Sequence, residues 1–215
     1  MKRRDFIRLS VLFLAGCALP PKSPSKSAAT RIAGPLAALP TAVPPEVVNC
    51  RWAPIVAPKP EPWPGLDQLD ANGLHVTARG VIIEPSVYRL RVIGLVDHPL
   101  NLTLNDLRCM PKMTAKNNMT CPGEFEDVTS FSGVPFKYLM GLAGVQKGAK
   151  AINMFAADNF KAYMNLEDAM QQYNYIAYQW QDQPLPILHG FPVRAVMATT
   201  FGYAWVKWLI QIQVT

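Results

Sequence analysis

The chain has 215 residues, half of them hydrophobic, and a formal net charge of +6 at neutral pH, which suits one domain of ordinary size plus additional segments. Four basic side chains and one acidic one in the first eight residues supply three of these charges, so about +3 remains elsewhere (6 − 3 = 3). Such a small excess, without basic runs interleaved with aromatic residues, argues against nucleic-acid binding.

The first seventeen residues have the features of an export signal. Lys2–Arg8 has the twin-arginine pattern of two arginines, a spacer, Phe, an aliphatic residue and a base. The apolar run Val11–Ala15 is far shorter than the roughly 20 residues that span a bilayer. Leu14–Cys17 resembles a lipobox, in which the cysteine thiol receives diacylglycerol. We therefore expect twin-arginine export to an extracytoplasmic, periplasmic site and membrane anchoring through lipid on Cys17. An uncleaved N-terminal anchor with an incidental cysteine is the alternative.

The next segment, residues 18–64, is rich in proline. Twelve of the twenty prolines of the chain lie in it, and proline fixes φ and removes a backbone donor. We expect a semi-rigid spacer that holds a domain formed by residues 65–215 away from the membrane. Its last part, Val47–Trp63, contains Cys50 and Trp52 and has enough apolar surface to pack onto the domain as an extended strap.

Residues 65–215 alternate between short strands and short helices. In chain order we expect a strand at Val87–Ile93, a helix at Thr103–Arg108, a strand that ends at Met119–Cys121, a helix at Val134–Ala143, strands at Ala151–Ala156 and Lys161–Met164, a short helix at Leu166–Met170, and strands at Tyr175–Trp180, Val193–Ala198 and Trp205–Val214. Thr103 is a typical N-cap, and Gly144 and Pro122-Gly123 are breaks. Because no regular βαβ repeat occurs, the pattern predicts an α+β fold with a mixed sheet.

The cysteines leave one thiol for chemistry. If Cys17 carries lipid, the other three are an odd number in an oxidising compartment, so one is unpaired or binds a metal. A Cys109–Cys121 disulfide would leave Cys50. A Cys50–Cys109 disulfide would instead leave Cys121 as a thiolate, the form that binds soft metals. The sequence leaves both pairings open, although a strand end before Pro122-Gly123 could present Cys121 to a cleft.

A second group of polar residues lies near the C-terminus. His189 and Arg194 stand at the two ends of a turn that leads into a strand, and Lys207 follows thirteen residues later. Arginine offers a planar fork to phosphate oxygens, lysine offers a point charge, and Gly202 would let the backbone approach a ligand closely. These residues form a candidate anion-binding site, and a solvated strand edge is the alternative. No zinc-site or serine-hydrolase motif accompanies them.

Short motifs recur in a fixed order along the domain. They are Tyr88–Val92, Gly94–Val96, Leu102–Leu107, Thr120–Gly123, Ser132–Phe136, Leu142–Val145, Leu166–Ala169, His189–Arg194, Gly202–Tyr203 and Val206–Leu209. From about Leu74 to Val214 the chain resembles the sulfite oxidase-type molybdopterin-dependent oxidoreductases, in their minimal bacterial branch with a single molybdopterin-binding domain. That branch includes the periplasmic methionine sulfoxide reductase subunit.

The resemblance implies a cofactor and a set of residues that hold it. The cofactor is one molybdenum with molybdopterin, and the metal is bound by one pyranopterin dithiolene, oxo groups and a single cysteine that maps onto Cys121. The cofactor-binding residues that the resemblance implies besides Cys121 are His189, Arg194, Trp205, Val206 and Lys207. The protein orients the cofactor and sets its electrostatic environment, while the cofactor carries the redox chemistry.

Two departures from the family pattern bear on activity. Ala204 stands where the family usually has Lys or Arg, and of an upstream Arg-Asn-His-like segment only Arg79 remains as a pocket candidate. We expect a catalyst of oxygen-atom transfer that exchanges electrons with a separate partner, a haem protein being one candidate. The alternative is a non-catalytic exported lipoprotein that keeps the fold as a binding module. Because no dimerisation domain follows, we expect a monomer.

The substrate expectation comes from charge. No arginine occurs between Arg108 and Arg194, while Glu124, Glu126 and Asp127 closely follow the expected metal ligand. An acidic rim would repel an anion, which arginine would normally bind. We therefore expect a small neutral or cationic substrate rather than sulfite.

Overall fold

The computed structural model describes residues 31–32, 50 and 52–215. The twin-arginine motif, the lipobox and most of the Pro-rich segment lie outside the described residues. Among the described residues, no helix is long and apolar enough to cross a bilayer.

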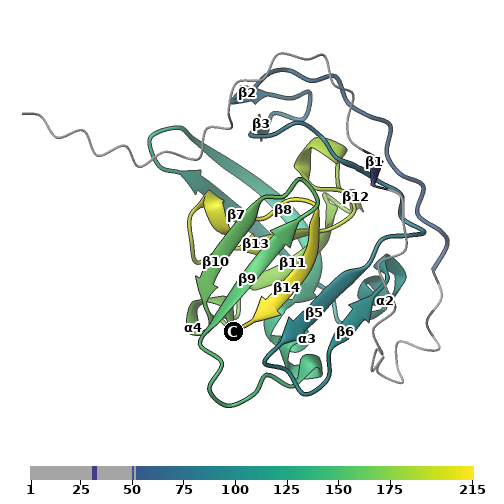
Figure 1. Cartoon of the computed structure of the whole chain (residues 1–215). Coiled ribbons are helices and arrows are strands. Elements are labelled where there is room, and N and C mark those ends of the chain that lie inside the picture. Colours follow the sequence, from purple (N-terminus) through teal and green to yellow (C-terminus); the bar gives the residue numbers. More distant parts are fainter. Residues whose placement is uncertain (1–30, 33–49, 51) are drawn as a thin grey trace, which may run out of the picture.

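Two sheets form the domain (Figure 1). The first has the order β10-β9-β14-β5-β6 and consists of β5 (Leu90–Gly94), β6 (Leu100–Leu102), β9 (Ala151–Ala156), β10 (Lys161–Asn165) and β14 (Leu209–Val214). Only the β14–β5 pair is parallel. The second is antiparallel, with the order β12-β11-β8-β7 and β13 also paired to β11. It consists of β7 (Met113–Cys121), β8 (Phe125–Pro135), β11 (Asn174–Trp180), β12 (Gln183–Pro184) and β13 (Arg194–Met197).

Short elements surround these sheets. The helices are α2 (Leu104–Cys109), α3 (Phe136–Ala143) and α4 (Leu166–Ala169), with 3-10 turns η1 (Ile187–His189) and η2 (Gly202–Ala204). Two small pairs complete the described elements: β2 (Gln68–Leu69) with β3 (His75–Val76), and β1 (Arg31–Ile32) with β4 (Ile82–Ile83). Mixed sheets with few short helices confirm the predicted α+β class.

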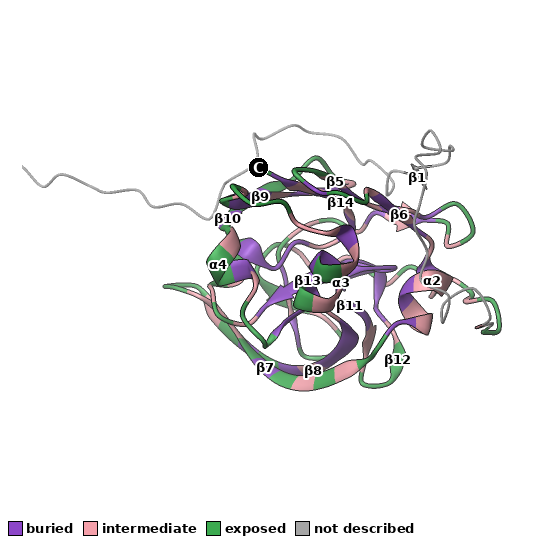
Figure 2. Cartoon of the chain, turned by 90° about the horizontal axis from the view of Figure 1, so that it is seen from below, coloured by how far each residue is buried: buried purple, intermediate pink, exposed green. Residues whose placement is uncertain are grey.

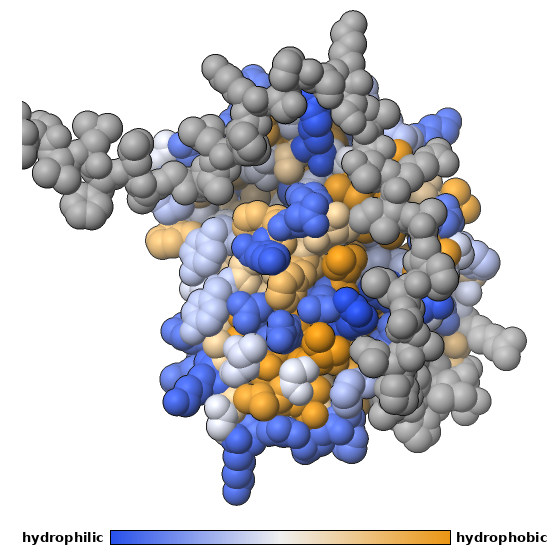
Figure 3. All heavy atoms as spheres, in the orientation of Figure 1, coloured by the Kyte–Doolittle hydropathy of each residue, from blue (hydrophilic) through white to orange (hydrophobic). Residues whose placement is uncertain are grey.

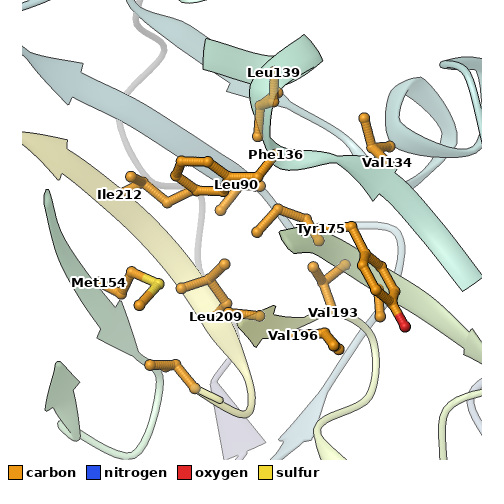
Figure 4. Close-up of a cluster of buried hydrophobic side chains, with 14 of the residues drawn as sticks. Leu90, Val134, Phe136, Leu139, Met154, Tyr175, Val193, Val196, Leu209 and Ile212 are labelled. Carbon is orange, nitrogen blue, oxygen red and sulfur yellow. The ribbon is translucent and has the colours of Figure 1, made fainter. Parts of the chain in front are cut away.

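The core fills the space between the sheets, as Figure 2 shows with buried segments between β5–β14 and β7–β8. In Figure 4, Leu90 and Ile212 of the first sheet lie near Phe136 of α3, and Tyr175 and Val196 belong to the second sheet; all five side chains are buried. Outward positions of β5, β9 and β14 are mostly half-buried, and the face seen in Figure 3 mixes hydrophobic and hydrophilic side chains. Buried and half-buried side chains thus alternate along these strands, and the buried ones lie on the inner face of the sheet.

Local chemistry explains where the helices begin and end. Thr103 and Asp106 form a complete capping box at α2, so this predicted helix is confirmed. At α3, Gly144 adopts φ 64° and ends the helix where the sequence predicted. The helix begins at Phe136 rather than at Val134, because Val134 and Pro135 still belong to β8.

Two predicted strands begin later than expected. The strand expected from Val87 begins at Leu90, since the N–H groups of Val87 and Tyr88 both donate to the carbonyl of Glu84 in a turn. The strand expected from Trp205 begins at Leu209, because Trp208 has φ 49°, which an extended strand does not accommodate. Residues 205–208 therefore form a loop, and this loop carries Lys207.

Candidate cofactor site

Cys121 is the last residue of β7 and is half-buried. Its cross-strand partner is Phe125, so the two side chains share the inner face of the β7–β8 hairpin. The turn between them follows the sequence prediction, with Gly123 at φ 83° and the Glu124 N–H donating to the Cys121 carbonyl at 3.0 Å. A Cβ placed on Gly202 would lie 4.0 Å from the Cβ of Cys121, so η2 lies beside the thiol.

The disulfide joins Cys50 to Cys109, with an S–S distance of 2.11 Å and a Cα–Cα distance of 5.8 Å. This resolves the two pairings that the sequence left open. Among the described cysteines, Cys121 lies outside the disulfide, as a metal ligand requires.

Arg194 is the buried centre of the site, with 2% of its surface exposed. Its guanidinium donates to the carbonyl oxygens of His189 at 3.2 Å and Trp205 at 3.3 Å, and it lies 3.8 Å from the sulfur of Met119. It also stacks over the ring of Phe131 at 4.9 Å. The buried Nε of Arg194 has no hydrogen-bond partner in the described structure, an arrangement that leaves one donor for a ligand.

Lys207 reaches the same turn from the loop before β14. Its Nζ donates to the Leu188 carbonyl at 3.0 Å and lies 4.8 Å from the centre of the Trp208 ring. Gly190, at φ 107°, allows this close approach, since a Cβ there would be 3.1 Å from the Cα of Lys207 and from the Cβ of Arg194.

His189 is oriented by Asp70, a residue that the sequence analysis did not identify. The distance from His189 Nε2 to Asp70 Oδ2 is 2.9 Å. Because a carboxylate only accepts, Nε2 carries the proton and the neutral ring offers Nδ1 as an acceptor. Asp70 also accepts from the N–H groups of Asn72 and Leu74, which hold the turn between β2 and β3.

Burial and neighbouring positive charge disfavour the charged forms of the basic groups in this site. Burial, with the charges of Lys207 and Arg194, lowers the pKa of His189 to about 4. Burial and Arg194 lower the pKa of Lys207 to about 7, and burial lowers the pKa of Arg194 to about 10. Asp70 opposes the shift of His189, Asp127 that of Arg194 and Asp158 that of Lys207. An anion bound here would stabilise the charged forms.

We expect the stability of the cofactor-free protein to rise with pH above about 7. The unfolded chain keeps the Lys207 proton to about pH 10, whereas the folded protein releases it near pH 7. The unfolded state therefore binds more protons in this window, which gives a slope of up to about 1.4 kcal/mol per pH unit. Urea unfolding at pH 7, 8 and 9 measures the slope, and Lys207→Met should flatten it. Parallel profiles for the two proteins would contradict this account.

The other predicted residues lie around this turn. Trp205 and Val206 are buried, and their carbonyl oxygens accept from Arg194 and from the Ala195 N–H respectively. The Trp205 N–H donates to the Gly202 carbonyl at 3.0 Å, so a backbone N–H contact to a cofactor would come from Val206. The structure thus gathers His189, Arg194 and residues 205–207 directly, and it connects them to Cys121 through Met119 and η2.

The expected acidic rim is only partly present. Glu124 and Glu126 are exposed, but Asp127 is buried, so its assignment to the rim was wrong. The Asp127 carboxylate lies 2.7 Å from Nδ1 of His75 and accepts from the backbone N–H of His75 at 2.9 Å. The imidazole of His75 stacks on Phe125 with ring centres 4.4 Å apart. No local sequence pattern links two residues that are 52 positions apart.

This geometry defines a protein that binds an anionic cofactor beside a thiol. The unpartnered Arg194 Nε, the repulsion between the charges of Lys207 and Arg194 and the close approach at Gly190 all fit the phosphate of a molybdopterin. The position of Cys121 fits a soft metal. Residues 75–215 match the family model of the oxidoreductase molybdopterin-binding domain. The chain therefore belongs to this family, which confirms the predicted resemblance and implies a molybdenum–molybdopterin cofactor.

Individual relatives agree with this assignment. The chain is 30% identical over 129 residues to the uncharacterized oxidoreductase YuiH of Bacillus subtilis, covering 60% of this chain and 65% of that protein. It is 27% identical to YedZ1 of Azospira oryzae, provisionally named a protein-methionine-sulfoxide reductase subunit, over 62% of this chain and 51% of that protein. The sulfane dehydrogenase SoxCD of Paracoccus pantotrophus has the same fold, with a TM-score of 0.61 at 23% identity over 68% of this chain and 43% of that one. The chain thus spans less than two thirds of these relatives.

Proposed function

We propose that this chain catalyses oxygen-atom transfer on a small, non-anionic substrate and exchanges electrons with a separate partner. The observation that carries the proposal is the pairing of a half-buried Cys121 outside the disulfide with a cluster of the buried His189 and Arg194 and the half-buried Lys207. One part suits a soft metal and the other an anionic group. Bound there, molybdenum with molybdopterin supplies two-electron redox chemistry.

Different residues of the chain would bind different parts of the cofactor. The Cys121 thiolate would bind the metal from the end of β7. Arg194 and Lys207 would bind phosphate oxygens, and His189 would accept a hydrogen bond at Nδ1 because Asp70 occupies Nε2. The aromatic rings under Arg194 exclude water and so strengthen its interaction with an anion.

Exposed groups beside Cys121 support a substrate without negative charge. Phe201 and Tyr203 flank Gly202 and are each 54% exposed. Glu124 is exposed in the turn that follows Cys121. Arg194 is buried and is assigned to the cofactor phosphate, so it would not serve an anionic substrate. Aromatic and acidic side chains favour neutral or cationic molecules.

A substrate screen with dye donors and acceptors tests the proposed chemistry. Neutral or cationic sulfoxides, N-oxides and thioethers should be turned over in one direction or the other, and sulfite should be turned over poorly. Rapid sulfite oxidation would contradict the proposed substrate class. A metal-loaded protein that turns over none of these compounds would favour the second candidate, a binding module. Ala204 motivates that candidate, because its buried methyl group supplies no positive charge to the cofactor.

We also propose that the protein is exported by the twin-arginine route and anchored by lipid on Cys17, as a monomer whose electron partner is extracytoplasmic. The ordered motifs Lys2–Arg8 and Leu14–Cys17 support this. Export of a folded protein also suits a cofactor that is inserted before export.

The mature protein should begin at a lipidated Cys17. Replacing Arg3 and Arg4 with lysines should leave precursor in the cytoplasm, because twin-arginine recognition depends on that pair. Cys17→Ala should prevent lipid attachment without changing the cofactor content. Intact-mass spectrometry of the membrane fraction measures the outcome. A different N-terminus without a lipid adduct would contradict the anchor, but not the oxidoreductase function.

A further inference from the structure

We propose that the extended segment Cys50–Trp63, called the strap here, belongs to the cofactor site and that Glu61 is a positioning residue for it. The inference rests on the proposed function and adds a part of the chain that the family match, which begins at residue 75, does not include. Figure 1 shows the segment running from the side of α2 along the outside of the molecule toward β2. No part of it forms a helix or strand in the described residues.

The first end of the strap is fixed at α2. Cys50 is bonded to Cys109, the last residue of that helix. The neighbouring Arg108 donates to the Ala53 carbonyl at 2.9 Å and lies 5.3 Å from the centre of the Trp52 ring. A covalent bond and two non-covalent contacts therefore hold Cys50, Trp52 and Ala53 against one helix end.

The far end of the strap lies beside the turn that carries His189. Ile55 and Ala57 pack on the core along the way. The ring of Trp63 lies 5.1 Å from the guanidinium carbon of Arg79. Next to Arg79, a Cβ on Gly80 would be only 2.8 Å from Ile187, so this segment packs tightly on η1.

Glu61 makes the contact that reaches the cofactor-binding groups. Its carboxylate accepts the Leu188 N–H at 3.2 Å. The carbonyl of the same residue, Leu188, accepts from Nζ of Lys207 at 3.0 Å. The next residue is His189, which Asp70 holds from the β2–β3 turn. Glu61 and Asp70 thus fix two successive residues of η1.

Fixing this turn places both Lys207 and His189. Without Glu61, the Leu188 N–H would lose its partner, and η1 could shift with the lysine that binds its carbonyl. The disulfide keeps Glu61 near its partner by shortening the free segment that must be ordered. We therefore expect the strap to slow the escape of the bound cofactor.

The test measures how fast molybdenum leaves the isolated holoprotein on dilution into a chelator, by metal analysis of the protein fraction. Glu61→Ala should release the metal about tenfold faster than wild type. Glu61→Gln keeps an acceptor oxygen and should recover much of the slow release. Glu167→Ala, which removes an exposed carboxylate on α4, is the matched control and should behave as wild type.

A double-mutant cycle separates the strap from a local effect of Glu61. Cys50→Ser with Cys109→Ser should also speed release, and adding Glu61→Ala should have less than its single effect, because both changes act through one segment. Circular dichroism checks that each variant is folded. Release from Glu61→Ala at the wild-type rate, or full additivity in the cycle, would overturn the inference alone. A wild-type protein without molybdenum would overturn the proposed function and the inference with it.

Discussion

Cys121→Ser should give a folded protein with essentially no oxidoreductase turnover. Cys121 is half-buried at a strand end, where a hydroxyl fits the space of a thiol. The hydroxyl is a much poorer donor to a metal that prefers soft sulfur ligands, and it changes the potential of that metal. The measurement is dye-coupled turnover per chain, read beside molybdenum content and circular dichroism.

A control on the same strand makes the Cys121 result specific. Lys116→Ser changes an exposed position of β7 and should keep wild-type turnover. If Cys121→Ser keeps substantial turnover while holding molybdenum, Cys121 is not the metal ligand. A disulfide to Cys121 in an active preparation would exclude that role as well.

Lys207→Met and Arg194→Ala should lower cofactor occupancy more than turnover per bound metal. Charge-assisted hydrogen bonds to a phosphate contribute on the order of 1.5–3 kcal/mol each, so losing one should weaken retention about tenfold or more. Lys207→Met keeps the length of the side chain and should relieve repulsion with Arg194 in the empty site. Occupancy is measured as molybdenum and pterin per chain.

An exposed lysine provides the comparison for this pair. Lys161 lies on β10 with its Nζ 5.4 Å from the Phe155 ring, and Lys161→Met should leave occupancy unchanged. Full occupancy in both Lys207→Met and Arg194→Ala would place the anion-binding site elsewhere in the chain.

Sequence patterns predicted the elements whose ends are set by neighbouring residues. The helix α2 begins where Thr103 and Asp106 exchange hydrogen bonds across three positions. The strand β14 was placed too early, because its start depends on Trp208. The indole of Trp208 donates to the Ile187 carbonyl at 2.8 Å, 21 positions away, and no local pattern predicts such a contact.

The residues of the candidate site likewise include some that the sequence predicted and some that only the structure identifies. Cys121, His189, Arg194 and Lys207 carry their chemistry in their own side chains, and family motifs surround them. Asp70 lies 119 residues before the histidine that it orients. Glu61 is 127 residues from its backbone partner. The sequence predicted a strap that contains Glu61 but nothing at Asp70, and only the folded chain brings either carboxylate to η1.

The most direct test of the central claim is the amount of molybdenum and pterin in the natively exported protein. Metal analysis and pterin quantification should each give about one equivalent per folded chain, and Cys121→Ser should lose turnover in the same preparation. A folded, exported wild-type protein that contains neither molybdenum nor pterin would contradict the account.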